Sequence, residues 1–211
     1  MLEDKLNHKI NSYEDAITST IIGLLKYLPT ELFWEILSRS CTDSTNLPNV
    51  SGELKAIDFW PKWCAKETCN SKYVEPDVFI RFACFDVIIE IKPYDDLGQH
   101  QIQWENQITS YHNEKGECDK QLYYISLGGN YLKSNQSIIY NDNEFIINKC
   151  NWIGVLLEVS NLLKELRGLK TIILNKDSTI RILEDIIRGF NYYGFYNISW
   201  FEEMKMYTIE Q

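Results

Sequence analysis

Two charged residues stand two positions apart in an otherwise apolar segment, and together they could support catalysis. Glu90 and Lys92 interrupt and follow the run from Val87 to Ile91. Side chains on a β-strand alternate between the two faces of the sheet, so Glu90 and Lys92 project from the same face. Burying a carboxylate and an ammonium there costs free energy unless each is paired or binds a metal ion. The pattern therefore favours a functional pair over chance.

A second carboxylate precedes this pair, because Asp77 lies thirteen positions before Glu90. Two carboxylates supply the hard oxygen ligands that Mg²⁺ or Mn²⁺ prefers. Such an ion lowers the pKa of a bound water and neutralises charge that develops on a phosphodiester during hydrolysis. A lysine beside it can orient the nucleophile or stabilise that charge. We expect Asp77 and Glu90 to be metal ligands, Lys92 to be the catalytic lysine, and the backbone carbonyl of Ile91 to be a further ligand.

The order Pro76-Asp77 followed by Glu90-x-Lys92 resembles the signature of the PD-(D/E)XK nuclease superfamily. Each element alone occurs by chance in many proteins, whereas their order, spacing and strand context agree here. The resemblance covers about residues 12–128. It implies an α/β fold with a restriction-endonuclease-like core, in which helices flank a mixed central sheet. It also implies a Mg²⁺-dependent (or Mn²⁺-dependent) deoxyribonuclease that hydrolyses DNA, in a setting such as phage defence.

Three further residues match the same superfamily. Gln107-x-x-x-Tyr111 is similar to the QxxxY element of its RecB-like branch, which implies catalytic roles for both side chains. Glu14 stands where many members carry an additional metal-binding acid. Glu14 also shares one helical face with Ile17 and Ile21, which directs it toward the core side of the first expected helix.

Other interpretations of these residues remain open. Asp77 could be a turn residue, Glu90 and Lys92 an ion pair on an exposed strand, and Glu14 an acid favoured by a helix N-terminus. Gln107 and Tyr111 could simply belong to an amphipathic helix. Further candidates have weaker support: Asp86 lies on the face of Glu90 but about 13 Å away along the strand, which excludes it. The remaining side chains considered, without an assigned role, are Glu75, His100, Trp104 and His112.

The elements that must position these residues follow from apolar periodicity. A helix over residues 13–28 is indicated by an apolar stripe, with Ser12 as its N-cap. Residues 130–150 are polar and give no assignment. Further helices are expected over 30–39, 97–114, 152–167 and from 178 to 193. Strands are expected within 54–65 and over 74–82, 84–92 and 121–128. The sequence also predicts a tight turn at residues 81–83 and places Cys84 in a buried strand.

Two parts of the chain are expected from this order of elements. Residues 1–150 would form the nuclease-like core, and residues 151–211 a helical C-terminal extension packed on that core. No motif in the extension suggests chemistry, so its expected role is packing.

Composition limits the classes of partner. The net charge of −9 and the isoelectric point of about 4.9 are unlike a free-standing nucleic-acid binder. We therefore expect contact with DNA to depend on a homo-oligomer or a partner protein subunit. The sequence has no long apolar stretch, its first residues do not resemble a signal peptide, and its six cysteines form no CxxC motif. These features favour a cytoplasmic protein with reduced thiols and no membrane contact.

Two rival hypotheses come from other classes of protein. The first is a catalytically silent nuclease-fold module that acts in assembly or regulation of a larger complex, and it predicts that Lys92 turns away from the carboxylates. The second is a structural protein in which the Glu-x-Lys pattern is coincidental, and it predicts that Asp77 and Glu90 lie far apart.

Overall fold

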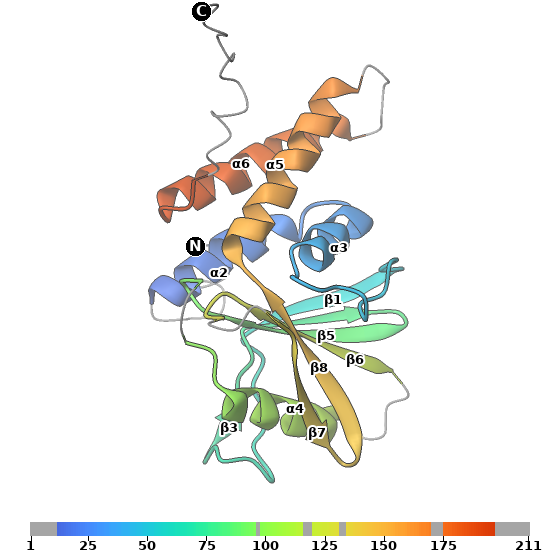
Figure 1. The fold of residues 1–211 in the computed structure, drawn as a ribbon, viewed down its shortest axis with the longest axis vertical. Helices are drawn as coiled ribbons and strands as arrows, with labels where there is room; N and C mark the ends of the chain where they lie inside the picture. Colours follow the sequence, from blue (N-terminus) through green and yellow to red (C-terminus); the bar gives the residue numbers. More distant parts are fainter. Residues whose placement is uncertain (1–11, 96–97, 116–119, 131–133, 170–174, 197–211) are drawn as a thin grey trace, which may run out of the picture.

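A six-stranded mixed sheet with helices on both of its faces forms the centre of the molecule (Figure 1). The computed structural model describes residues 12–95, 98–115, 120–130, 134–169 and 175–196. The expected α/β architecture, a mixed central sheet flanked by helices, is confirmed. The described helices are α2 (Tyr13–Leu25), α3 (Thr30–Arg39), α4 (Gln101–Lys115), α5 (Trp152–Gly168) and α6 (Lys176–Tyr192).

The strand order in the sheet is β1-β4-β5-β6-β8-β7. The β5–β6 and β6–β8 pairs are parallel, whereas the β1–β4, β4–β5 and β7–β8 pairs are antiparallel. The carboxyl ends of β5, β6 and β8 therefore meet at one edge. The strands are β1 (Leu54–Phe59), β4 (Val78–Phe82), β5 (Phe85–Ile91), β6 (Gln121–Leu127), β7 (Gln136–Tyr140) and β8 (Asn143–Cys150), and a separate small sheet pairs β2 (Trp63–Cys64) with β3 (Tyr73–Val74).

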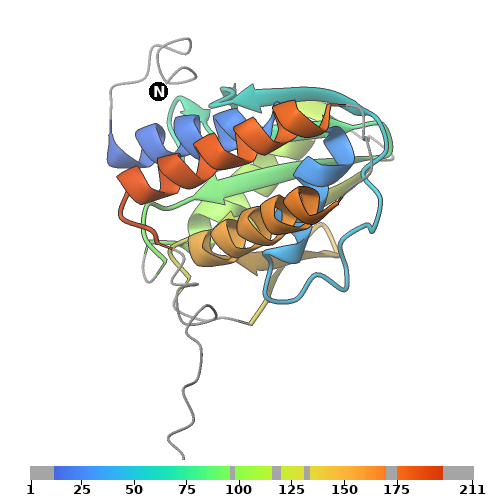
Figure 2. The same cartoon turned by 90° about the horizontal axis from the view of Figure 1, so that it is seen from above.

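The two faces of the sheet are covered unequally. Helices α2, α3, α5 and α6 lie over one face, and α4 lies over the other (Figures 1 and 2). Along β5, Val87, Ile89 and Ile91 join the larger core under the four helices. Ile88 joins the smaller core against α4. Because side chains alternate, Glu90 must project toward α4 as well.

Helix α2 begins where its capping residue predicts. The Ser12 hydroxyl accepts a hydrogen bond from the backbone N–H of Asp15 at 3.0 Å. Ile17 and Ile21 are fully buried, as the apolar stripe indicates. The helix ends at Leu25, three residues earlier than expected. Because α2 begins at Tyr13, Glu14 lies in its first turn, at the N-terminal end.

One detail of the expected strands is wrong, and one hairpin lies in a segment that received no assignment. The turn between β4 and β5 falls at residues 83–84, so Cys84 is exposed in a turn and not buried in a strand. Residues 136–150, within the unassigned polar segment, form the β7–β8 hairpin. Its turn residues, Asn141 and Asp142, have φ angles of 48° and 61°. Two consecutive left-handed residues are typical of a type I′ hairpin turn, and Asn and Asp adopt that conformation readily.

The C-terminal helices share the larger core with the elements that precede them. Trp152, Leu183 and Phe190 are buried in the same cluster as Ile21 and Ile91. The indole N–H of Trp152 also donates to the backbone carbonyl of Lys92 at 2.7 Å, so α5 helps to hold the end of β5. Residues 197–211 of the expected extension lie outside the described residues. Within the described part of the chain, no helix is long and apolar enough to cross a membrane.

Candidate metal centre

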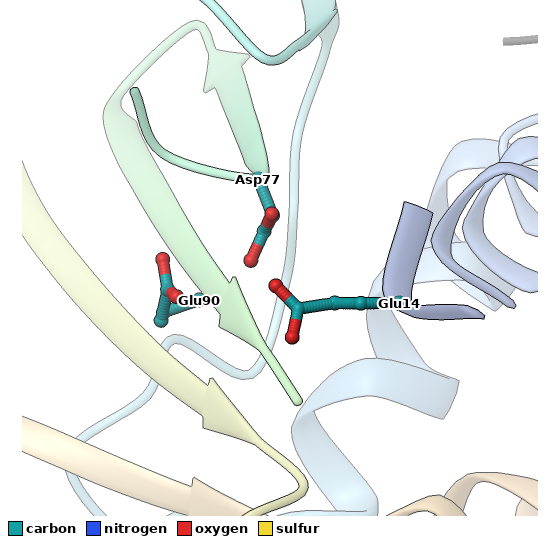
Figure 3. Close-up of side chains that lie close together, drawn as sticks. All are labelled: Glu14, Asp77 and Glu90. Atoms are coloured by element: carbon teal, nitrogen blue, oxygen red, sulfur yellow. The ribbon is translucent and has the colours of Figure 1, made fainter. Parts of the chain in front are cut away.

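Three carboxylates from three separate elements converge at one edge of the sheet (Figure 3). Glu14 comes from the first turn of α2, Asp77 directly precedes β4, and Glu90 lies in β5. One oxygen of each lies within 4.8 Å of the others. Asp77 and Glu90 are buried, whereas the Glu14 side chain is partly exposed. The structure therefore brings together the three side-chain ligands expected from the sequence.

Asp77 is held by the end of the neighbouring strand. The ladder between β4 and β5 ends at the pair Val78 and Ile89, so the backbone of Ile91 lies beyond it. The N–H of Ile91 instead donates to Asp77 Oδ2 at 2.7 Å. The N–H and C=O of one strand residue point to the same side of the strand. The Ile91 carbonyl therefore faces the side where Asp77 lies, as its expected role as a ligand requires.

Glu90 receives hydrogen bonds on both carboxylate oxygens. Lys92 Nζ lies 2.7 Å from Oε1, and the side-chain amide of Gln103 donates to the same oxygen. The amide of Gln107 donates to Oε2 at 2.6 Å. The hydroxyl of Tyr124 in turn donates to Gln107 and fixes which way its amide points. Gln107 thus orients Glu90.

Gln103 was missed as a site residue. It lies one turn before Gln107 on α4, at the i,i+4 spacing that places two side chains on one helical face. That spacing was the one signal in the sequence. Because glutamine is common on solvated helix faces, the spacing alone did not distinguish Gln103 from surface residues.

Lys92 lies between two of the carboxylates. Its Nζ is 2.7 Å from Glu90 and 3.3 Å from Glu14. The backbone around it leaves no room for a larger residue at Gly128, where an added Cβ would stand 2.4 Å from the Lys92 carbonyl oxygen. Gly128 also has a φ of 71°, which favours glycine. The loop after β6 therefore packs closely against the backbone at the end of β5, and only glycine fits at position 128.

Burial and mutual repulsion perturb the buried carboxylates. Burial raises the pKa of Asp77 well above its ordinary value, and the charges of Glu90 and Glu14 raise it further. Burial also raises the pKa of Glu90, although Lys92 opposes that shift. For Lys92, burial lowers the pKa, but the charges of Glu90 and Asp77 outweigh burial and the net shift is upward. Asp77 and Glu90 are thus more costly to ionise than free carboxyl groups.

The charges of the cluster fit a divalent cation. Three ionised carboxylates and the single ammonium of Lys92 leave an excess of two negative charges. A divalent ion that ligates the carboxylate oxygens would balance this excess in a buried place, where an unbalanced charge is expensive. Hard oxygen ligands and no sulfur or imidazole point to Mg²⁺ or Mn²⁺ over Zn²⁺.

Tyr111 is not brought to the cluster. Its hydroxyl donates to Asp86 Oδ2 at 3.0 Å, and Lys120 Nζ lies 3.3 Å from the other oxygen of Asp86. Asp86 is four residues before Glu90 on β5, about 13 Å away. One turn of α4 advances about 6 Å along the sheet, which carries Tyr111 away from Glu90 while Gln107 reaches it. A direct catalytic contact by Tyr111 has no support in this geometry.

The weaker candidates also lie elsewhere. His112 stacks on Tyr140 with ring centroids 4.9 Å apart, and burial lowers its pKa. His100 is exposed, and Glu75 is not among the three clustered carboxylates. Trp104 is buried against the sheet. Asp86 lies outside the cluster, as its distance along β5 predicts.

The fold and the cluster together define an α/β protein with a candidate divalent-metal centre. No family model and no solved structure matches this chain. The chain is 30% identical over 200 residues to the uncharacterized protein PM0110 of Pasteurella multocida (strain Pm70), a match that spans 91% of this chain and 74% of that protein. The chain therefore belongs to the same family as PM0110.

Proposed function

We propose that this protein is a Mg²⁺-dependent or Mn²⁺-dependent nuclease that hydrolyses phosphodiester bonds of DNA. The observation that carries the proposal is the convergence of Glu14, Asp77 and Glu90 within 4.8 Å, with Lys92 Nζ 2.7 Å from Glu90. The resemblance to PD-(D/E)XK nucleases supports the same residues in the same roles. It also supplies the preference for DNA, the expected core type and a setting such as phage defence. We also propose a cytoplasmic location.

Each residue of the cluster has a distinct task in this proposal. The carboxylates of Glu14, Asp77 and Glu90 would hold the ion, together with the carbonyl of Ile91. The bound ion would supply a water of lowered pKa and positive charge next to the scissile phosphate. The Lys92 ammonium can donate a hydrogen bond to the attacking water or to a phosphate oxygen. The Lys92 ammonium is already directed into the carboxylate cluster, which is where this role requires it.

Gln103 and Gln107 act through Glu90. Their amides donate to its two oxygens and fix the plane of its carboxylate. A fixed carboxylate plane determines which lone pairs face the ion. These glutamines are therefore positioning residues and do not contact the reacting atoms in this proposal.

The geometry favours catalysis over the silent module. A Lys92 turned away from the carboxylates would favour that rival, whereas Lys92 contacts both Glu90 and Glu14. The coincidental Glu-x-Lys interpretation requires Asp77 and Glu90 to lie far apart, whereas their oxygens are within 4.8 Å. Two buried carboxylates whose pKa values are both raised by burial are costly to retain without a ligand. A bound divalent ion would offset that cost.

The acidic balance of the chain shapes the proposed partners. With a net charge of −9, the protein repels a polyanion, most strongly at low salt. We propose that a second copy of the chain or another subunit completes the DNA contact. Tight binding of DNA by a monomer at physiological salt, measured by sedimentation with labelled duplex, would show this part to be wrong.

The test is cleavage of linear and circular DNA with Mg²⁺, with Mn²⁺ and with EDTA. Wild type is compared with Lys92→Met and Asp77→Asn, which keep side-chain size, and with Lys55→Met, which alters an exposed ion pair on β1. We expect metal-dependent cleavage by wild type and Lys55→Met, and losses of about 100-fold or more in the two site variants. Wild type that neither cleaves DNA nor binds either ion by calorimetry would refute the proposal.

A further inference from the structure

A second buried lysine, Lys149 on β8, has no anionic partner among the described residues. It is 3% exposed, and its ammonium lies 3.7 Å from the ring centroid of Trp104. The ring face offers electrostatic attraction but no hydrogen-bond acceptor. Burial lowers the pKa of Lys149 to about 8, with no carboxylate to oppose the shift. A buried ammonium in this condition is costly, which suggests that an anion completes its surroundings.

Lys149 lines a cavity of about 290 Å³ at the carboxyl ends of β6 and β8. Two other donors line it with no acceptor among the described residues: the hydroxyl of Thr42 and the side-chain N–H groups of Asn151, whose oxygen caps α5. Asp95, the one carboxylate among the described residues that line the cavity, accepts from the backbone N–H groups of Trp152 and Ile153. Its charge is thus directed to the N-terminus of α5. The lining of the cavity thus includes one basic residue and two residues with neutral donor groups.

The register of the sheet connects this cavity to the metal centre. Glu90 pairs with Ser126, and Ser126 pairs with Lys149. The three residues form one row across parallel strands on the face toward α4. Two strand spacings place the Cα atoms of Glu90 and Lys149 roughly 10 Å apart. That separation equals about three rises of 3.4 Å along the axis of a DNA duplex.

Trp104 makes a physical link between the two sites. Its ring faces Lys149, and its indole N–H donates to the side-chain oxygen of Gln99 at 2.8 Å. The amide of Gln99 donates to the backbone carbonyl of Glu90 at 3.1 Å. These contacts connect Lys149 to Glu90 through the side chains of Trp104 and Gln99, and they fix its position relative to Glu90.

We propose that Lys149 and its cavity form a phosphate-binding subsite, which holds a backbone phosphate of the DNA strand a few nucleotides from the bond that is cleaved. This inference rests on the proposed function and names the part of the protein that positions its substrate. It also explains how an acidic chain holds a polyanion: the attraction comes from a fixed ammonium within the site and not from the overall charge.

Binding of a short fluorescent DNA oligonucleotide tests the subsite in the full chain. Anisotropy is measured over a range of salt concentrations in Ca²⁺, with wild type, Lys149→Met, Lys149→Arg and the exposed control Lys55→Met. Loss of one charge-assisted phosphate contact should weaken binding about 10-fold to 100-fold. It should also reduce the slope of log affinity against log salt by about one. Lys149→Arg should retain most of the affinity, and Lys55→Met should match wild type.

Inorganic phosphate gives a second readout that needs no DNA. The indole N–H resonance of Trp104, assigned with Trp104→Phe, is followed by NMR as phosphate is added. We expect a saturable shift in wild type and in Lys55→Met, and none in Lys149→Met. A saturable shift together with an oligonucleotide affinity that is independent of Lys149 would assign the cavity to free phosphate and overturn the substrate role.

The two proposals fail in different ways. Equal oligonucleotide affinity and equal salt slope in wild type and Lys149→Met would overturn the subsite, whether or not the protein cleaves DNA. Calorimetry with Mn²⁺ on Lys149→Met should still show the ion bound at the carboxylates, because Lys149 does not contact them. A third result is that wild type neither binds Mn²⁺ nor cleaves DNA and still binds the oligonucleotide through Lys149. That result would refute the nuclease proposal and leave the subsite as a DNA-binding site.

Discussion

The substitution Asp77→Asn should have opposite consequences with and without a divalent ion. It exchanges one of three clustered carboxylates for a neutral amide of nearly the same size. The amide oxygen can still accept the Ile91 N–H that Asp77 accepts at 2.7 Å. The change therefore removes charge while it preserves the local hydrogen bond. It eliminates repulsion from Glu90 and Glu14 and also an attraction to Lys92.

The size of the effect follows from the geometry. Two unit charges 4.8 Å apart, the outer limit of the cluster, interact by roughly 3.5 kcal/mol at an effective dielectric constant of about 20 and by roughly 0.9 kcal/mol in bulk water. Two repulsions and one attraction leave about one such repulsion. In EDTA, above the raised pKa of Asp77, the variant should be more stable than wild type by about 1–3 kcal/mol.

The pH dependence has a definite sign. A carboxyl group whose folded pKa is raised stays protonated in the folded state after it has ionised in the unfolded state. The cost to wild type is thus absent below the unfolded pKa of about 3.9. It grows as the pH rises from there toward the folded pKa, and is complete above it. In EDTA, wild type should therefore lose stability over this range relative to Asp77→Asn.

A divalent ion reverses the advantage. An ion that binds the folded state alone stabilises wild type by about 2.7 kcal/mol at 100 times its dissociation constant. For a chain of this size, that corresponds to a rise in Tm of roughly 5–10 °C. Asp77→Asn lacks one of the three carboxylate ligands and should gain much less. Its advantage in EDTA should shrink or disappear in Mg²⁺.

Urea denaturation followed by tryptophan fluorescence, in EDTA and in Mg²⁺, measures both quantities. Asp58→Asn is the control, because Asp58 forms a half-exposed ion pair with Arg81 and is not one of the three clustered carboxylates. It should respond to Mg²⁺ as wild type does. If Mg²⁺ stabilised wild type and Asp77→Asn equally, or if Asp77→Asn were the less stable protein in EDTA at high pH, the electrostatic reasoning for the cluster would be wrong.

Three further outcomes are expected from single substitutions. Gly128→Ala should destabilise the fold by at least about 2 kcal/mol in urea, because the φ of 71° disfavours alanine and the new Cβ would meet the Lys92 carbonyl at 2.4 Å; stability equal to wild type would contradict this. Tyr111→Phe should keep DNA cleavage within about threefold, since its hydroxyl bonds away from the cluster, while Gln107→Ala should lose about 10-fold to 100-fold; equal losses would show that both residues serve catalysis. Lys149→Met should be more stable than wild type by on the order of 1–2 kcal/mol at pH 7, a figure reduced for solvent screening. Because the folded pKa is about 8 and the unfolded pKa about 10.4, wild type should regain stability as the pH rises between them, and a constant difference in urea unfolding up to pH 10 would count against a buried charge.

The sequence predicted the acidic pair and its lysine because their signal is local. Glu90 is a charged residue in a strand whose seven positions are all buried, and Lys92 directly follows the last residue of that strand. Alternation along a strand fixes their common face without knowledge of the rest of the fold. Asp77 needed one more step, since its approach to Glu90 depends on the β4–β5 hairpin. That hairpin was expected from two adjacent apolar runs, although its turn lay slightly later than predicted.

What the sequence could not predict depends on contacts between distant elements. Tyr111 and Gln107 share a helical face, but only the direction of α4 across β5 decides which of them reaches Glu90. Lys149 was not identified as a candidate because the sequence around β8 did not indicate a strand. The Asn141-Asp142 turn would have revealed the hairpin and placed Lys149 in a strand. Its parallel pairing next to Ser126 still required the structure.

The parallel centre of the sheet links the metal centre to the proposed subsite. Parallel strands end at the same edge, so a cation in β8 that is in register with Glu90 must lie two strand spacings from it. At physiological ionic strength, charges beyond about 8 Å are largely screened. The acidic residues elsewhere on the surface therefore weaken DNA contact less than the net charge of −9 suggests. Lys92 and Lys149 act at contact distance, where screening is small, and a second subunit would need to extend the DNA contact rather than create it.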